Sequence, residues 1–334
     1  MVPDFLFMHN QRGFVGVGTL IAILIGLAVL VVGAYYVLQQ QAPTQTVIEN
    51  FDNVQTLPTT NNQAQQLVKN KPTTREPASN PPSPQKSTVL PAVQIKSSWD
   101  CNPVSPSSDL NLNVFYKKVC VVQGIPIVSS ETVPDRALIQ AAVIMKGMLD
   151  ARPDIVQRLV IHKMKVAILG ANEVTTMLPE YAFLKNDTQT DWDLRARGLG
   201  ATIAVPLASG AEENLLCYSS DVYKRESIFL HEFAHSIKDL GVIFLDPSFN
   251  EKLEATYQSA LSNGLWKNTY AAANREEYWA EGAQDYFDAN ASTEPADGIH
   301  NLIHTREQLK TYDPLLYELV AKVFPTEWRY QCPR

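Results

Sequence analysis

Two histidines and a glutamate occur at a spacing that can bind and use a metal ion. In the segment Ser227–Ile237 (SIFLHEFAHSI), His231 and His235 are four residues apart and Glu232 directly follows the first histidine. On a helix, residues four apart share a face, so both imidazoles can reach one ion. Glu232 would lie beside that ion and accept a proton from water. The pattern predicts a zinc-dependent hydrolytic site with Glu232 as general base.

Such a site needs a third protein ligand. Gly241 occupies the position six residues after His235 where metzincins carry another histidine, so that class is excluded. Downstream, the segment Glu276–Asp285 (EEYWAEGAQD) offers several carboxylates. We expect Glu281 to be the third ligand because it lies in mid-helix between small residues. Glu277 is expected in the first turn, where solvent and the helix dipole stabilise a charge.

Together these segments resemble the gluzincin zinc peptidases. HEFAH and the segment Tyr270–Glu281 (YAAANREEYWAE) are similar to the catalytic domain of the anthrax lethal factor group and its secreted relatives. The resemblance implies that zinc is bound by His231, His235 and Glu281. It also implies that Glu232 is the general base of a metalloendopeptidase.

The resemblance further implies supporting residues. In thermolysin-like gluzincins an aspartate four residues after the ligand glutamate contacts a ligand histidine, and Asp285 occupies that position. Lethal factor-like enzymes use an upstream tyrosine to stabilise the oxyanion, for which Tyr270 and Tyr278 are the two candidates. Each tyrosine also fits a packing role. His300 and His304 lack a glutamate between them and are expected at a solvated helix end.

The elements that must position these residues follow a mixed pattern. Met164–Leu169 is predicted to be a strand, and Ala201–Pro206 an edge strand that could bind an extended peptide. Helices are predicted at Asp135–Asp150, Ser220–Leu240, Ser248–Ser262, Glu276–Ala289 and Pro314–Val323. Strands and helices followed by helices alone indicate an α+β fold. We expect a two-lobed, zincin-like domain with zinc between the HEFAH helix and the Glu281 helix.

The amino-terminal part has a different composition. Residues 14–38 carry no charge and are long enough to cross a bilayer core of roughly 30 Å. Arg12 precedes them, which predicts a cytoplasmic tail at 1–13 and the remainder outside. We expect a single-pass anchor; a cleaved signal peptide and a prepilin-like leader are the alternatives. Residues 39–97 are predicted to be a disordered linker, and 98–334 the catalytic domain.

All four cysteines follow the expected anchor, as in an oxidising compartment. Of the three possible connectivities we favour Cys101–Cys120 as a local bridge and Cys217–Cys332 as a bridge to the carboxyl terminus. No CxxC motif occurs, so neither a cysteine zinc ribbon nor a thioredoxin-like site is expected.

Charge and motifs together favour one function over its alternatives. With 28 Lys+Arg against 35 Asp+Glu and no basic run, nucleic acid is not an expected partner. We expect cleavage of an extracytoplasmic protein or peptide. One alternative is a non-catalytic, membrane-anchored surface module with a structural zinc, against which the presence of Glu232 argues. Another is a pilin-like assembly protein. The sequence leaves the substrate and the oligomeric state open.

Overall fold

A computed structural model describes residues 98–224 and 226–333, which belong to the unit Ser87–Arg334. The anchor expected at 14–38, with its tail and linker, lies outside the described residues. Among the residues that are described, no helix is both long and apolar enough to cross a bilayer. The α+β class is confirmed, because a single mixed four-stranded sheet is combined with helices.

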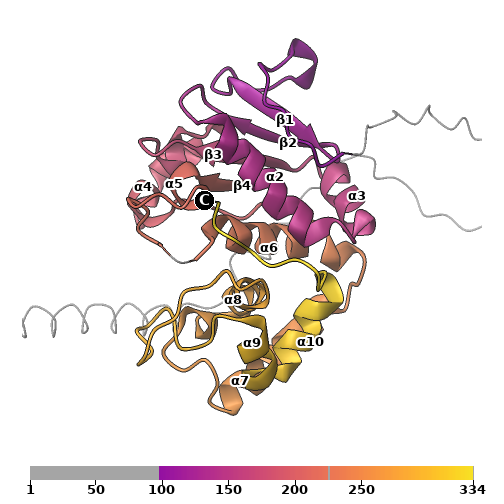
Figure 1. The fold of residues 1–334 in the computed structure, drawn as a ribbon, viewed down its shortest axis with the longest axis vertical. Coiled ribbons are helices and arrows are strands. Elements are labelled where there is room, and N and C mark those ends of the chain that lie inside the picture. Colours follow the sequence, from indigo (N-terminus) through magenta and orange to yellow (C-terminus); the bar gives the residue numbers. More distant parts are fainter. Residues whose placement is uncertain (1–97, 225, 334) are drawn as a thin grey trace, which may run out of the picture. The chain divides into compact units, whose positions relative to one another are not determined.

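The sheet forms one side of the described unit (Figure 1). Its strands, in spatial order, are β1 (Lys118–Val122), β2 (Ile125–Ser129), β3 (Lys165–Leu169) and β4 (Leu207–Ala211). The first pair is antiparallel and the other two pairs are parallel. The main core lies between the sheet and the helices. A smaller apolar cluster, including Val128, Leu169 and Tyr181, covers the opposite face.

The strand predicted at 201–206 is wrong, because none of these residues lies in a strand. The structure has irregular backbone with bends at 201–206, and β4 begins only at Leu207. The sequence of β4, LASGA, has little strand propensity, but all five of its residues are buried. Its residues are small because a helix packs on them: a Cβ at Gly210 would be 3.0 Å from Phe229. Packing against that helix, which local propensity does not reveal, therefore decides where this strand runs.

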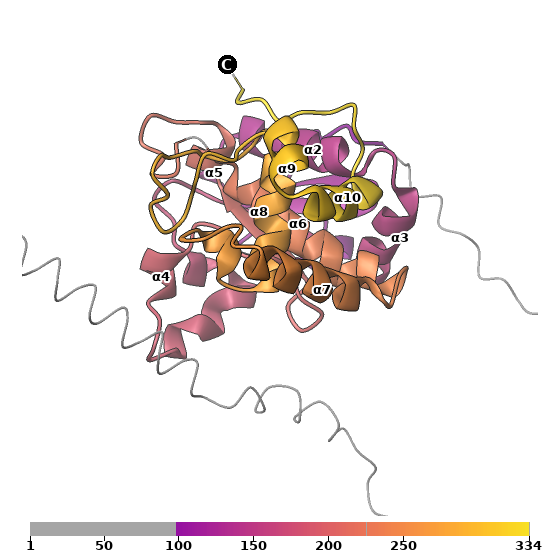
Figure 2. The ribbon, with the colours of Figure 1, turned by 90° about the horizontal axis from the view of Figure 1, so that it is seen from below.

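The helices are arranged around one central helix, α6. In Figure 1, α6 runs between the sheet above and the helices below, and it contacts both β4 and α8. The view from below shows α7, α9 and α10 around α8 (Figure 2), and all three contact it. The helices are α2 (Asp135–Leu149), α3 (Pro153–Ile161), α4 (Trp192–Arg195), α5 (Glu212–Leu215), α6 (Ile228–Leu240), α7 (Phe249–Ser262), α8 (Arg275–Tyr286), α9 (Arg306–Tyr312) and α10 (Pro314–Val323).

Capping residues fix where the two central helices begin. Ser227 caps α6, its Oγ accepting a hydrogen bond from the Leu230 amide at 3.4 Å. The helix therefore starts eight residues later than the predicted start at Ser220. Asn274 caps α8, and its Oδ1 accepts from the amides of Glu276 and Glu277 at 2.9 and 3.0 Å. Such caps satisfy amides that have no partner within the helix.

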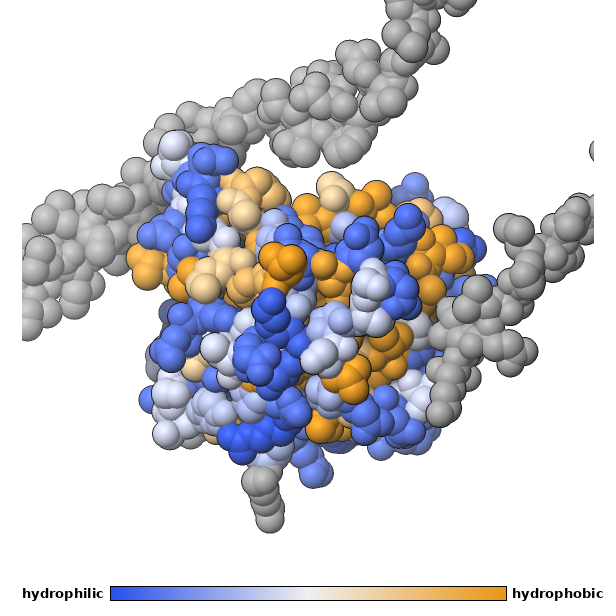
Figure 3. Space-filling model, turned by 90° about the horizontal axis from the view of Figure 1, so that it is seen from above, coloured by the Kyte–Doolittle hydropathy of each residue, from blue (hydrophilic) through white to orange (hydrophobic). Residues whose placement is uncertain are grey.

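Both predicted disulfides are confirmed. Cys101–Cys120 joins the segment before the sheet to β1, with Cα atoms 5.2 Å apart. Cys217–Cys332 joins the loop after α5 to the carboxyl-terminal segment, with Cα atoms 6.0 Å apart. On the face drawn in Figure 3, hydrophobic areas alternate with hydrophilic ones, as is usual for a globular domain.

Candidate metal centre

A cavity of about 750 Å³ opens beside α6. The segment before β4, the loop before α6, the first turn of α8 and the loop after α8 form its walls. Its lining includes His231, Glu232 and His235 from α6, together with Tyr270 and Glu277. The motif found in the sequence therefore faces a cleft between the sheet side and the helical side of the fold.

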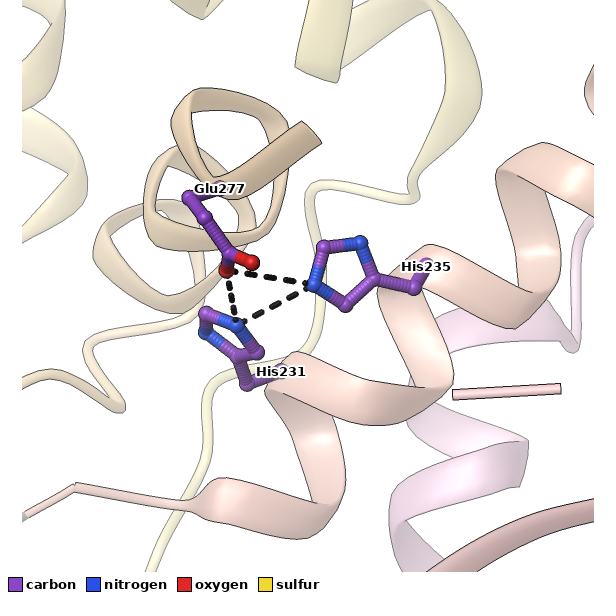
Figure 4. A group of neighbouring side chains, drawn as sticks. All are labelled: His231, His235 and Glu277. Atoms are coloured by element: carbon purple, nitrogen blue, oxygen red, sulfur yellow. Dashed lines mark hydrogen bonds and ion pairs between the residues drawn. The ribbon is translucent and has the colours of Figure 1, made fainter. Parts of the chain in front are cut away.

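Three side chains converge in this cleft (Figure 4). The Nε2 atoms of His231 and His235, one turn apart on α6, are 3.2 Å from each other. Glu277 reaches them from α8, with its Oε2 3.0 Å from His231 Nε2 and 3.4 Å from His235 Nε2. Among the described residues, these three form the one group with the geometry of a metal site.

These distances suit zinc. With zinc–ligand bonds of about 2.0–2.2 Å and tetrahedral angles, two donor atoms lie about 3.3–3.6 Å apart. Two imidazole nitrogens and one carboxylate are also a common donor set of catalytic zinc. The Nδ1 atom of His231 is hydrogen-bonded to Gln284. The lone pair on its Nε2 atom is therefore free to point toward the other two donors. The residues present therefore fit a zinc ion.

The predicted third ligand, Glu281, lies elsewhere. Its Oε1 is 3.5 Å from Nδ1 of His231, on the far side of the ring from the Nε2 atoms, and its Oε2 accepts from Asn290 at 3.0 Å. Glu277 and Glu281 share one face of α8, but only Glu277 is level with both histidines. The first turn of α8 points into the cleft, so the Glu277 side chain is only 18% exposed rather than solvated.

The predicted role of Asp285 is filled by its neighbour. Asp285 Oδ1 accepts from Asn290 at 2.9 Å, and among the described residues Asp285 forms no hydrogen bond or ion pair with a histidine. Gln284 Oε1 is 2.8 Å from His231 Nδ1, while its amide nitrogen donates to the Ser227 carbonyl. This hydrogen-bonding pattern assigns the Nδ1 proton and orients Nε2 toward Glu277. The spacing in the sequence predicted this turn of α8, and here Gln284 rather than Asp285 contacts the histidine.

Charge around the histidines favours a cation. Burial opposes the charged form of His231, but Glu277, Glu232 and Glu281 together raise its pKa to about 10. Burial also opposes the Glu277 carboxylate, yet hydrogen bonds from both histidines hold its pKa well below the usual value. Three carboxylates around a buried imidazole favour positive charge at this point, and a divalent ion can supply it.

Glu232 lies under a glycine-containing segment. A Cβ at Gly198 would be 3.1 Å from Glu232 Cγ, and a Cβ at Gly200 would be 2.8 Å from His235 Cβ. Only glycine lets the backbone pass this close to α6 without displacing those side chains. Residues 198–200 therefore cover the side chain of Glu232, the candidate general base.

The two candidate tyrosines have different surroundings. Tyr270 lines the cleft, with its ring centroid 6.3 Å from that of His231. Burial and the nearby Glu277 raise the pKa of Tyr270, so its hydroxyl keeps its proton and can donate it to a hydrogen bond. Tyr278 is fully buried and its hydroxyl donates to Asp313 at 2.6 Å. Tyr278 therefore packs in the interior rather than facing the cleft, and Tyr270 is the candidate that lines it.

His300, expected at a solvated helix end, instead lines the cleft outside any helix. Its Nε2 is 3.3 Å from Glu226 Oε2, and both side chains are about nine-tenths buried. This pair joins the loop before α6 to the loop after α8. His304 lies outside the cavity lining and bonds to the Leu302 carbonyl. The sequence reasoning missed this pair because Glu226 and His300 are far apart along the chain.

The fold and the site define an α+β domain with a candidate His-His-Glu metal centre. No family model and no curated protein matches the sequence. Among solved structures, the chain is similar to the Pro-Pro endopeptidase PPEP-2 from Paenibacillus alvei, with a TM-score of 0.41 and 19% identity. That similarity covers 59% of this chain and 97% of the other. We therefore interpret the site from its own geometry.

Proposed function

We propose that this protein is a zinc-dependent endopeptidase whose metal is held by His231, His235 and Glu277. The observation that supports this most is the convergence of these three donors, all within 4.8 Å of one another, next to Glu232. A purely structural zinc would have four protein ligands and no need for a base. Here three donors and an adjacent carboxylate face an open cavity, as a hydrolytic site requires.

The residues of the site would divide the chemistry among them. When bound, zinc lowers the pKa of a water molecule and polarises the substrate carbonyl. Glu232 accepts the proton of the attacking water and returns it to the leaving amine. Tyr270 donates a hydrogen bond to the oxygen on which negative charge develops. Gln284 and Glu281 hold the His231 ring through its Nδ1 atom.

The segment over Glu232 would bind the substrate backbone. Leu199 pairs with Ser209 of β4, its carbonyl accepting from the Ser209 amide at 2.8 Å. Because peptide groups alternate along an extended chain, those of Gly198 and Gly200 point away from β4, on the cleft side. They can pair with an extended peptide by strand addition. This moves the binding edge expected at 201–206 to residues 198–200.

We also propose that the active domain works outside the membrane, with residues 14–38 as its anchor. The apolar composition of that segment and the two disulfides support this location. The resemblance of the HEFAH and YAAANREEYWAE segments to the lethal factor group supports the gluzincin class. In this proposal Glu277 replaces Glu281 as the third ligand.

A peptide-library digest of the zinc-loaded full chain tests the function. We expect cleavage that a chelator abolishes and added zinc restores. Glu232→Gln should keep its zinc but lose about two to four orders of magnitude in kcat, because only proton transfer is removed. Glu251→Gln, an exposed position on α7, is the matched control. A wild-type chain that holds zinc and cleaves no peptide would indicate a structural zinc module instead.

A further inference from the structure

One wall of the cleft carries a short helix that is firmly held. Helix α4 is capped by Asp191, and Asp193 accepts hydrogen bonds from the amide and hydroxyl of Thr176, each at 2.8 Å. The Trp192 indole donates to Asp187 at 2.8 Å. These bonds fix the helix to the 3-10 turn Thr175–Met177 and to the preceding loop. These bonds hold the backbone of α4 in place, so the side chains that face the cleft project from a fixed position.

Two of those side chains, Trp192 and Arg195, line the cavity. The guanidinium of Arg195 lies 5.8 Å from the Trp192 ring centroid, within range of a cation–π interaction. Arg195 is exposed, and none of the ion pairs formed among the described residues includes it. A guanidinium at the wall of a cleft without a carboxylate partner is available to a ligand.

Several other charged groups in the same lining already have partners. Arg197 binds both carboxylate oxygens of Glu213, at 2.7 and 3.0 Å. Asp297 accepts from the amides of Ile299 and His300. Glu226 is paired with His300, and Asp239 lies next to Lys238, whose ammonium contacts it. Among the described charges of the cavity wall, the Arg195 guanidinium stands out as a cation with no acidic partner.

Arg195 faces the same cavity as the proposed catalytic centre. His231, Glu232, Tyr270 and Glu277 line that cavity together with Trp192 and Arg195. A substrate group bound by Arg195 would therefore lie in the cleft that holds the scissile bond.

We propose that Arg195 is a specificity residue that binds a carboxylate of the peptide substrate, an inference that rests on the proposed peptidase function. A guanidinium pairs with a carboxylate through two parallel hydrogen bonds, and an arginine is better suited to this than a lysine. The carboxylate can belong to an Asp or Glu side chain or to the carboxyl terminus of a short substrate. The same Arg195 contact would select either one.

The test uses the full chain and matched peptides. One set carries Asp or Glu, then Asn, Gln or Lys, at each position around the cleaved bond; a second set compares a free carboxyl terminus with an amide. We expect the wild type to favour a carboxylate at one position by about ten- to a hundredfold in kcat/KM. Arg195→Glu should reverse this preference toward Lys at that position. A preference confined to the free terminus would identify the terminal carboxylate as the source.

A second readout does not depend on turnover. In the Glu232→Gln background, binding of the same peptides is measured by fluorescence polarisation, with and without Arg195→Glu. Lys146→Glu, an exposed change of equal charge on α2, is the control and should leave the preference unchanged. Charge-independent binding, or an equal loss for all peptides with Arg195→Glu, would overturn the inference. Carboxylate-dependent binding, together with no cleavage of any peptide by the zinc-loaded wild type, would support Arg195 while contradicting the peptidase proposal.

Discussion

At the scale of single residues, Glu277 and Glu281 lie one helical turn apart on one face of α8. The 3.6-residue period identifies this face from the sequence, but it does not tell which turn is level with the histidines of α6. That depends on where α8 crosses α6 and on the Asn274 cap, which holds the first turn in the cleft. A helix start is therefore not always a solvated position.

The two glutamates should affect zinc binding differently. Glu277→Ala removes a donor that lies 3.0 and 3.4 Å from the two Nε2 atoms, and should abolish stable zinc binding. Glu281→Ala removes a contact behind His231, so zinc affinity should fall by about ten- to a hundredfold. Competition with a zinc chelator measures both. If Glu281→Ala loses the metal while Glu277→Ala keeps it, the ligand assignment is wrong.

The remaining site residues show what residue patterns can and cannot predict. His231, Glu232 and His235 are adjacent in sequence, so their spacing alone predicts that they share a site, and the structure brings them together at the cleft. Asp285 was inferred from its spacing to Glu281 and Tyr278 from a resemblance, and both side chains are buried. Sequence spacing gives the direction of a side chain on its helix but not what packs against it.

At the scale of elements, amphipathic helices were easier to predict than strands. Helix α10 begins and ends as predicted, because Pro314 and the preceding Asp313 mark its start. Helix α6 begins late because Ser227, rather than Ser220, caps it. The strand at 207–211 was missed because its small residues have low strand propensity. Their small size allows close contact with α6 instead. Strands β1 and β2 were missed as well.

The contact between the two cleft loops should depend on pH. The hydrogen bond to Glu226, helped by the charges of Glu281 and Asp297, raises the pKa of His300 in the folded protein. Its stabilisation is therefore fully present below the unfolded pKa of about 6.5 and is lost as pH rises through the folded pKa. His300→Asn should cost about 1–3 kcal/mol at pH 6 and less at higher pH.

Urea unfolding of both chains at a fixed zinc concentration, from pH 6 to pH 9, measures this difference. A difference in unfolding free energy that stays constant across the range would show that the pair does not depend on the charge of His300. A difference that grows with pH would contradict the assigned direction of the pKa shift. His304→Asn is the control, because the His304 ring is hydrogen-bonded to the Leu302 carbonyl in its own loop rather than to a carboxylate.

At the scale of the whole molecule, the carboxyl-terminal segment is tied to the sheet side of the domain. Cys332 is bridged to Cys217, 115 residues earlier, across the part of the chain that contains α6 to α10. Arg306 supports the same segment by donating to the carbonyls of Thr326 and Trp328. The bridge therefore closes a loop that contains α6 and α8, the two helices that carry the site.

Removing this bridge should destabilise the whole domain. Because the closed loop is long, the Cys217→Ser, Cys332→Ser double variant should lose about 2–5 kcal/mol of unfolding free energy. The Cys101→Ser, Cys120→Ser variant removes a bridge that closes a loop of only 19 residues and should lose less. Denaturant unfolding under non-reducing conditions compares the two. Equal stability of the first variant and the wild type would mean that the bridge is not needed to hold the two sides together.

The most direct test of the metal centre is a crystal structure of the zinc-loaded protein, with anomalous scattering measured on both sides of the zinc edge. We predict one strong anomalous peak per chain, about 2.0–2.2 Å from Nε2 of His231, Nε2 of His235 and a carboxylate oxygen of Glu277. A peak coordinated by Glu281 in place of Glu277, or no peak between α6 and α8, would contradict the account.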